Sequence, residues 1–302
     1  MSEALHPPPR IAAAPISWGV CEVPGWGAVL DAPTVLAEMA ALGITATEFG
    51  PPGYLPHDPG EIRALLGRYG IRGIGGFLAH ALHTDPAAAV ETARITIDRY
   101  AAAGAEVLVL AAATGAEGYD ARAALSESEW RTLLATAATI AELAADRGLR
   151  TVMHPHVGTH IETESQIERF LADSPMELCL DTGHILVGGG DPVRSVRRYA
   201  DRVGHVHLKD VRAAVLAEVG AGTITYTEAV RRGLYAPLGA GDIDIAALLT
   251  ALRDSGYGGW YVVEQDTALR PGESAREPSR AAARSLEHLA RLLVATRSWV
   301  QA

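Results

Sequence analysis

The sequence predicts one closed (β/α)8 barrel, a TIM barrel of the α/β class, over all 302 residues. Short runs with the composition of β-strands alternate with longer Ala- and Leu-rich runs typical of helices, and the pair occurs eight times. Strict alternation implies a parallel sheet with right-handed crossovers, and eight units close a barrel. No change of composition and no low-complexity linker divides the chain, so we expect a single domain over residues 1–302.

The expected elements follow in chain order. Strands are expected at residues 11–17, 45–49, 73–78, 106–111, 150–154, 177–181, 203–208 and 260–264. Helices are expected at residues 34–41, 61–69, 87–103, 127–147, 164–171, 193–200, 245–254 and 280–296. A capping aspartate followed by proline marks the start of three helices, at Asp58, Asp85 and Asp191. Glycine, which readily adopts the left-handed conformation, ends the first four helices, at Gly43, Gly70, Gly104 and Gly148.

An open doubly wound sheet is the rival fold for this alternation. Its usual signatures are a G-x-G-x-x-G turn, a phosphate-binding loop or a G-x-S-x-G turn, and the sequence contains none of them. The longest irregular stretch, about residues 211–241, follows the seventh strand. A long loop at this end of a barrel often serves as a lid or an oligomer contact, so the sequence leaves a homo-oligomer open.

Charge and composition exclude several classes of function. The formal net charge is −10, and such a surface repels nucleic acid and anionic membranes. A DNA-repair endonuclease on this fold would need a basic groove, so neither nucleic acid nor membrane is an expected partner. No run of about 18 apolar residues is present, and residues 1–10 contain three consecutive prolines instead of a signal peptide, so we expect a cytoplasmic protein.

The two cysteines, Cys21 and Cys179, lie far apart in the sequence. They form neither a disulfide framework nor a clustered thiolate site. We expect both to be small buried apolar side chains.

Lys209 is the one lysine of the sequence, and the other strongly basic residues are all arginine. It lies in the run His-Val-His-Leu-Lys-Asp at residues 205–210. In an extended strand, His205, His207 and Lys209 project to one face. Two imidazoles and an ammonium do not make a stable apolar core, so this face indicates a site for a metal or an anionic oxygen. The alternative is a partly exposed strand that carries its lysine by chance.

Ionisable side chains lie at the C-terminal ends of most of the expected strands. They are Glu48, His80, His83, His154, His156, His160, Asp181, His184, His205, His207, Lys209 and Glu264. Barrel enzymes collect their active-site residues at this end, so these side chains are expected to converge. Imidazoles and carboxylates without thiolates suit one first-row divalent metal ion. We expect manganese or cobalt, with iron or zinc as alternatives.

Several of these residues also have a structural interpretation. Asp181 could cap the helix that follows it, and Glu48 could pair with an arginine of a neighbouring loop. Glu264 directly follows a buried strand, where a carboxylate needs a partner or a metal. Surface, capping or packing positions are the alternatives for four histidines, His80, His83, His156 and His160.

Aromatic residues near the expected strand ends are candidates for substrate contact. Trp18, Trp26 and Tyr54 could form ordinary packing at the rim or a wall on which a polyol ring stacks. The full set of candidate substrate contacts is Trp18, His80, His160 and Arg212.

Seven segments, in order, carry a family resemblance. They are APISWG at residues 14–19, TEFG at 47–50, HPHVGT at 154–159, DTGH at 181–184, HVHLKDVR at 205–212, PLGAGDID at 237–244 and GYGGWYVVEQD at 256–266. Together they resemble the xylose-isomerase-like barrel superfamily of sugar isomerases, epimerases and dehydratases. Within it, the chain is most similar to the inosose dehydratases of inositol catabolism.

The resemblance implies one metal ligand after each of strands five to eight, at His154, Asp181, His207 and Glu264. The wider family usually has glutamate at the strand-five position, where this chain has His154. In the epimerases two ligand glutamates are thought to serve as the acid/base pair, so the departure puts a two-glutamate mechanism in doubt. The resemblance also implies that His184 and Lys209 contact substrate oxygens. The choice between His154 and His156 as ligand stays open at this stage.

The expected reaction is metal-dependent dehydration of a keto-inositol (inosose) or similar cyclic keto-polyol through an enediolate. The metal stabilises the enediolate, and Lys209 stabilises the developing oxyanion. Glu48, His156 and Glu264 are the candidate bases and His184 and His156 the candidate acids, and the sequence does not order them. Isomerisation or epimerisation of a sugar or sugar phosphate at the same metal is the alternative. A ligand-binding subunit without chemistry is disfavoured by the intact set of ionisable strand ends.

Overall fold

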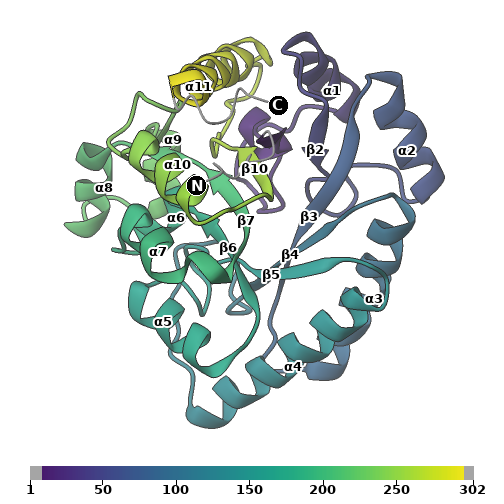
Figure 1. The fold of residues 1–302 in the computed structure, drawn as a ribbon, viewed down its shortest axis with the longest axis vertical. Coiled ribbons are helices and arrows are strands. Elements are labelled where there is room, and N and C mark those ends of the chain that lie inside the picture. The colour runs from purple at the N-terminus through teal and green to yellow at the C-terminus, as the bar shows by residue number, and fades with distance from the viewer. Residues whose placement is uncertain (1–8, 296–302) are drawn as a thin grey trace, which may run out of the picture.

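The computed structural model describes residues 9–295 and contains the expected barrel. Eight parallel strands close in the order β1-β10-β7-β6-β5-β4-β3-β2, and helices surround them (Figure 1). The barrel strands are β1 (Arg10–Ala13), β2 (Ala46–Glu48), β3 (Arg72–His80), β4 (Val107–Ala112), β5 (Arg150–Met153), β6 (Glu177–Asp181), β7 (Val203–Leu208) and β10 (Trp260–Val263). The predicted fold class is therefore confirmed, and the eight strands lie close to their predicted positions.

The eight predicted helices are also present. They are α1 (Ala32–Ala41), α2 (Pro59–Arg68), α3 (Pro86–Ala102), α4 (Glu127–Ala145), α5 (Glu164–Asp173), α7 (Pro192–Tyr199), α10 (Ile245–Asp254) and α11 (Arg276–Ala295). The three predicted aspartate caps accept hydrogen bonds from backbone N–H groups of the first turn, as expected for Asp58, Asp85 and Asp191. A short 3-10 turn, η2 (Ala200–Arg202), leads from α7 into β7.

The first strand is shorter than predicted. It ends at Ala13, and Pro15–Trp18 form a 3-10 helix, η1, where the sequence predicts strand up to residue 17. The reason is Pro15, which has no N–H to donate to a neighbouring strand and is suited to the first turn of a helix.

The side chains inside the barrel change from apolar to polar along the barrel axis. Val107, Val109, Val152 and Cys179 form an apolar cluster from strands β4, β5 and β6. Two residues beyond Cys179 on the same strand lies Asp181, and alternation turns both side chains to the same face. Cys179 is buried as predicted, whereas Cys21 is only partly buried. The apolar layer therefore supports polar side chains at the C-terminal ends of the strands.

A cluster of four side chains, here called the aromatic clasp, lies at the N-terminal end of the barrel and consists of Trp260, Arg10, Arg72 and Glu106. The guanidinium carbons of Arg10 and Arg72 lie over the Trp260 ring, 4.0 Å and 4.7 Å from its centroid. Glu106 accepts hydrogen bonds from both arginines and from Trp260 Nε1. The clasp joins the starts of β1, β3, β4 and β10, which are far apart in the sequence.

Replacing Trp260 with alanine is expected to lower the free energy of unfolding by about 3 kcal/mol or more, because a large buried ring and two cation–π contacts are lost. Denaturant unfolding measures the change. Arg94→Ala, which removes exposed ion pairs on α3, is the matched control and should leave the free energy of unfolding nearly unchanged. A similar small loss for Trp260→Ala would show that the clasp does not stabilise the barrel.

The stretch at residues 211–241 is ordered, where the sequence predicts an irregular loop. It contains α8 (Ala213–Gly220), α9 (Tyr226–Arg231) and a two-stranded antiparallel sheet of β8 (Asp210–Val211) and β9 (Tyr235–Ala236). These elements are too short for hydrophobic periodicity to reveal. Their apolar side chains, which include Val211, Tyr226 and Leu234, form a second small core together with Trp26 and Val157 from outside the insertion.

Asp210 anchors this insertion at the end of β7. Its two carboxylate oxygens accept hydrogen bonds from four backbone N–H groups, those of Val211, Gly239, Gly241 and Ile243, at 2.8–3.0 Å. A side chain at Gly241 would place its Cβ 2.3 Å from Asp210 Oδ1, so this close approach requires glycine.

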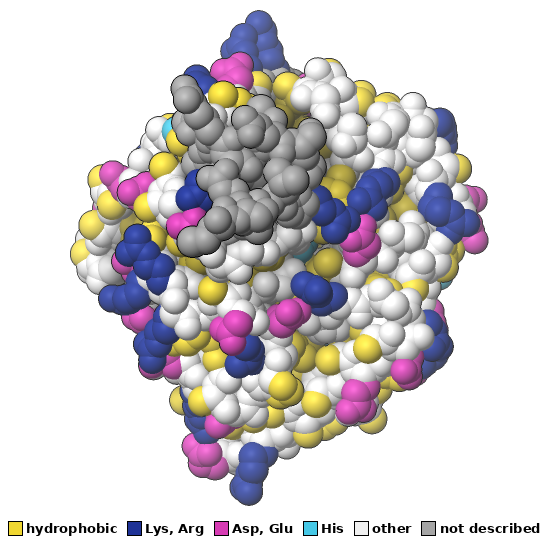
Figure 2. All heavy atoms as spheres, in the orientation of Figure 1, with side chains coloured by type: hydrophobic (Ala, Val, Ile, Leu, Met, Phe, Trp, Pro, Cys, Tyr) yellow, Lys and Arg dark blue, Asp and Glu magenta, His cyan; other side chains and the backbone are white. Residues whose placement is uncertain are grey.

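The charged side chains of the surface are of both signs (Figure 2). In the part of the chain that the structure describes, no helix has the length and hydropathy to span a membrane. Basic and acidic side chains are interspersed over the face shown in Figure 2 and do not gather into one basic area. Several lie in ion pairs, such as Arg194 with Glu164 and Arg198 with Glu168.

Candidate active site

A cavity of about 220 Å³ opens at the C-terminal end of the barrel. Its polar side includes Glu48, His154, His156, His207, Lys209, Glu264 and Asp266, and Glu22 lies among the other lining residues. Its apolar side includes Pro15, Ile16, Val20, Trp26, Pro51, Phe77 and Tyr119. The cavity is much larger than one water molecule and combines apolar walls with a few polar groups, as small-molecule sites do.

Loops form the apolar wall. Trp26 packs edge-on against Tyr119, with ring centroids 6.2 Å apart, and its Nε1 donates to the Thr267 carbonyl. Tyr119 donates a hydrogen bond to Glu22. Of the three aromatic residues considered for a stacking wall, Trp26 therefore lies at the cavity.

Four side chains meet at the strand ends where the sequence predicts a metal site. His207 Nδ1 lies 3.5 Å from Asp181 Oδ2 and 3.2 Å from Glu264 Oε2. His154 Nε2 lies 3.3 Å from the same oxygen of Asp181. All four residues are buried. Ligands about 2.1 Å from one metal ion stand about 3.0–3.4 Å apart, so the spacing of these atoms suits a first-row divalent ion.

Asp181 has two roles, one for each oxygen. Oδ1 accepts a hydrogen bond from the His184 N–H and caps α6 (Thr182–Val187), a short helix that the sequence does not predict. Oδ2 faces His154 and His207. The capping interpretation and the ligand interpretation of this residue are therefore compatible.

Lys209 is buried among three carboxylates and an imidazole. Its Nζ lies 3.1 Å from Asp181 Oδ2, 3.0 Å from Glu264 Oε2 and 2.9 Å from Asp266 Oδ1. It lies 3.0 Å from His184 Nε2, to which it can donate. Burial by itself lowers the pKa of Lys209, but Asp181 and the other carboxylates outweigh it and hold that pKa well above its usual range. The ammonium is therefore charged.

Gly183 makes room for this lysine. A Cβ at residue 183 would lie 2.8 Å from Lys209 Cβ and 2.7 Å from a ring carbon of Tyr235. The DTGH motif thus supplies a ligand candidate, a capped turn and the space that Lys209 fills.

Glu48 reaches across the barrel from β2 to β7. Its Oε1 accepts hydrogen bonds from His205 Nε2 at 2.9 Å and from His207 Nε2 at 3.0 Å. Burial raises the pKa of Glu48, but the His207 and His205 imidazoles outweigh it and hold that pKa well below its usual range. Glu48 pairs with these two histidines and not with the loop arginine that the sequence suggests as an alternative.

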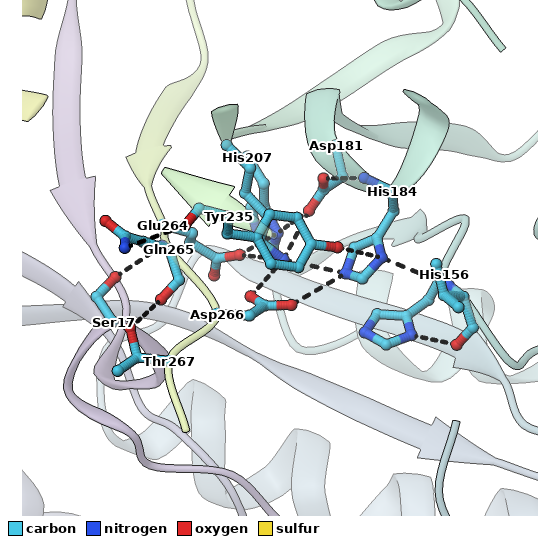
Figure 3. A network of polar contacts seen from close by, with 12 residues as sticks. Ser17, His156, Asp181, His184, His207, Tyr235, Glu264, Gln265, Asp266 and Thr267 are labelled. Atoms are coloured by element: carbon cyan, nitrogen blue, oxygen red, sulfur yellow. Dashed lines mark hydrogen bonds and ion pairs between the residues drawn. The ribbon is translucent and has the colours of Figure 1, made fainter. Parts of the chain in front are cut away.

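His156 and His184 lie side by side, with ring centroids 3.8 Å apart (Figure 3). His156 Nδ1 lies 2.8 Å from the Val157 carbonyl, so this nitrogen carries the proton and Nε2 keeps its lone pair. Burial lowers the pKa of both imidazoles well below the usual range. His156 is buried, so its surface interpretation is wrong.

A network that the sequence did not indicate completes the polar side. Tyr226 donates to Asp266 at 3.3 Å and lies 3.0 Å from the hydroxyl of Tyr235, which in turn lies 3.4 Å from His184 Nδ1. Burial raises the pKa of Asp266 to about 6. Asp266 stands two residues after Glu264 (Figure 3), beyond the end of β10 at Val263, where the strand period no longer applies. The tyrosines come from the insertion and carry no signal in the sequence either.

Four predicted substrate contacts lie elsewhere. Among the described residues that line the cavity, Trp18, His80, His160 and Arg212 are absent. Trp18 is buried against α11 and donates to Ser279, while Arg212 donates to backbone carbonyls of the insertion. His160 is buried, not on the surface, with its ring 4.4 Å from that of His83 and its Nδ1 on the Ala123 carbonyl.

Residues 36–292 match the family model described as xylose isomerase-like TIM barrel. The chain belongs to this family. It is 36% identical over 278 residues to the inosose dehydratase of Geobacillus kaustophilus strain HTA426. The alignment covers 87% of this chain and 89% of that protein. The predicted resemblance is confirmed, and this member of the xylose isomerase-like family is an enzyme of its dehydratase branch.

Solved structures show the same xylose isomerase-like barrel. The D-allulose 3-epimerase of Methylomonas sp. superposes with a TM-score of 0.69 at 20% identity, covering 96% of this chain and all of that one. The IolI protein with a bound zinc atom superposes with a TM-score of 0.69 at 14% identity, covering 94% of this chain and 98% of that one. At these identities the likeness concerns the fold.

Proposed function

We propose that the protein is a metal-dependent hydro-lyase that removes water from a keto-inositol or a similar cyclic keto-polyol. The observation that carries the proposal is the buried set His154, Asp181, His207 and Glu264, in which both imidazoles face Asp181 Oδ2 and His207 also faces Glu264 Oε2. The choice of reaction is supported by a relative, because the chain is 36% identical to a protein named inosose dehydratase.

The proposed ligands are His154, Asp181, His207 and Glu264, and the proposed ion is Mn²⁺ or Co²⁺. His154 is preferred to His156, because His154 reaches Asp181 whereas His156 Nδ1 is engaged by the Val157 carbonyl. A bound ion would supply Lewis-acid stabilisation of the charge that develops on the ketone oxygen.

His156 is the proposed base that takes the proton next to the ketone. It lines the cavity, and its Nδ1–H is held by the Val157 carbonyl, so Nε2 is the nitrogen that can accept a proton. Its orientation is thus set by the backbone before substrate enters.

The Lys209–His184 pair is the proposed acid. Lys209 Nζ lies 3.0 Å from His184 Nε2, and the His184 ring stacks beside His156. A charged donor thus stands next to the base, where it can protonate the departing hydroxyl and stabilise the developing oxyanion. Asp266 holds the ammonium in place.

Epimerisation remains the alternative reaction. A second ligand glutamate would be needed for a two-glutamate mechanism, and the proposed ligand set has one, Glu264. His154 stands where the other glutamate would be. This favours elimination of water over transfer of a proton between two faces.

The test is to incubate the Mn²⁺- or Co²⁺-loaded protein with a keto-inositol and a panel of ketoses. We expect an increase in enedione absorbance with the keto-inositol, loss of the signal after chelation and recovery when metal is returned. Epimers of the ketoses without enedione would support the alternative. Full dehydratase activity after exhaustive chelation would refute the metal dependence.

A further inference from the structure

Glu48 lies at the end of β2, which β1 and β10 separate from β7, and it binds two imidazoles of β7 through a single oxygen. We infer that Glu48 is a positioning residue that holds His207 with its Nδ1 directed at Asp181 and Glu264, and that it is not the base of the reaction. The inference rests on the proposed metal site, and it removes one of the three candidate bases that the sequence leaves open.

The first argument concerns the two nitrogens of His207. Its Nε2 lies 3.0 Å from Glu48 Oε1, so the proton of a neutral ring is held on Nε2. The lone pair then belongs to Nδ1, which faces Asp181 Oδ2 and Glu264 Oε2. His207 Nδ1 forms no hydrogen bond of good geometry within the described part of the chain, as a nitrogen directed at a metal position would not. A carboxylate behind a ligand histidine commonly fixes its tautomer and ring orientation.

The second argument concerns His205. It lies on β7 two residues before His207, is fully buried, and donates through Nε2 to the same Oε1. Two N–H donors on the same face of β7 therefore fix the orientation of the Glu48 carboxylate. Oε1 thus faces two ring N–H groups of β7.

The third argument is topological. Glu48 is separated from His205 by 157 residues and from His207 by 159 residues. The interaction therefore links β2 to β7 through the barrel interior. Strand β2 has three residues, and a register shift lies between Thr47 and Glu48. That irregularity is where the strand end presents Glu48 to β7.

The experiment compares Glu48→Ala and Glu48→Gln in the full-length protein. Affinity for Co²⁺ alone is measured by competition with a chromogenic chelator, and the visible absorption of bound Co²⁺ reports the geometry of the ligands. Turnover of the keto-inositol is measured at saturating metal. Glu22→Ala is the matched control, since Glu22 also lines the cavity but is bonded to Tyr119 and not to the imidazoles.

We expect Glu48→Ala to weaken Co²⁺ binding about 10- to 100-fold and to shift the Co²⁺ spectrum. Glu48→Gln keeps an oxygen that accepts from His207 Nε2, so it should bind Co²⁺ within a few-fold of the parent and retain most of the metal-saturated turnover. Glu22→Ala should leave Co²⁺ affinity unchanged. Because Gln preserves the shape, this pattern stands even if the alanine variant folds poorly.

Two results would overturn the inference. Glu48→Gln with parental Co²⁺ affinity but no turnover would identify Glu48 as the base. Parental affinity and spectrum in Glu48→Ala would show that His207 needs no positioning. The metal measurements use no substrate, so they remain decisive if the protein binds Co²⁺ but does not dehydrate the keto-inositol. A parent protein that binds no divalent ion would refute both this inference and the proposed function.

Discussion

Replacing Lys209 with arginine or methionine is expected to lower turnover about a hundredfold or more, comparable to the loss of one oxyanion donor. The ammonium fits within 2.9–3.1 Å of three carboxylates and His184, in space that Gly183 leaves open. A planar guanidinium keeps the charge but is too large for this position. Methionine keeps the approximate shape and removes the charge.

Metal affinity distinguishes this role from that of a ligand. Lys209 Nζ competes with any cation for Asp181 Oδ2 and Glu264 Oε2, so Lys209→Met should bind Mn²⁺ at least as tightly as the parent. Loss of a ligand would weaken binding instead. Turnover within a few-fold of the parent in either variant would refute the role given to Lys209. The metal-free methionine variant should also unfold more easily, because three buried carboxylates lose their cation.

His154→Phe and His156→Phe are expected to affect different properties, the first metal binding and the second turnover. His154→Phe should weaken metal binding by more than about a hundredfold, because the loss of a ligand exceeds the loss of an outer partner. His156→Phe should retain the metal and lose about 10²- to 10⁴-fold in turnover, the usual contribution of a general base. Isothermal titration with Mn²⁺ and steady-state kinetics at saturating metal measure the two effects.

The control for this pair is His160→Phe, because His160 is buried on the neighbouring loop but does not line the cavity. It should leave Mn²⁺ affinity unchanged. The reverse pattern, with the metal lost in His156→Phe and kept in His154→Phe, would exchange the assigned roles. Circular dichroism confirms that the barrel is intact in each variant.

The sequence predicts most of the barrel and the face of β7 that carries His205, His207 and Lys209. Both follow from local patterns, the alternation of strand and helix and the two-residue period of a strand. The same period does not separate His154 from His156, because β5 ends at Met153 and the chain is no longer an extended strand there. Geometry after a strand end depends on the fold.

Contacts between segments that are distant in the sequence cannot be predicted from local patterns. Nothing near Glu48 in the sequence indicates two histidines of β7 as its partners. Likewise, Trp18 follows the shortened first strand and faces α11, where its position in the sequence suggested the cavity rim. The tyrosines of the insertion reach His184 and Asp266 only because short elements, invisible to periodicity, fold over the strand end.

The two consecutive residues that follow β7 point their side chains in different directions. Lys209 turns inward to the carboxylates of the cavity, and Asp210 turns outward to the four backbone N–H groups that hold the insertion. The residue that anchors the insertion and the residue that carries the buried ammonium are thus joined by one peptide bond. A displacement of the insertion, whether by a ligand or by a neighbouring molecule, must act on the backbone that carries Lys209.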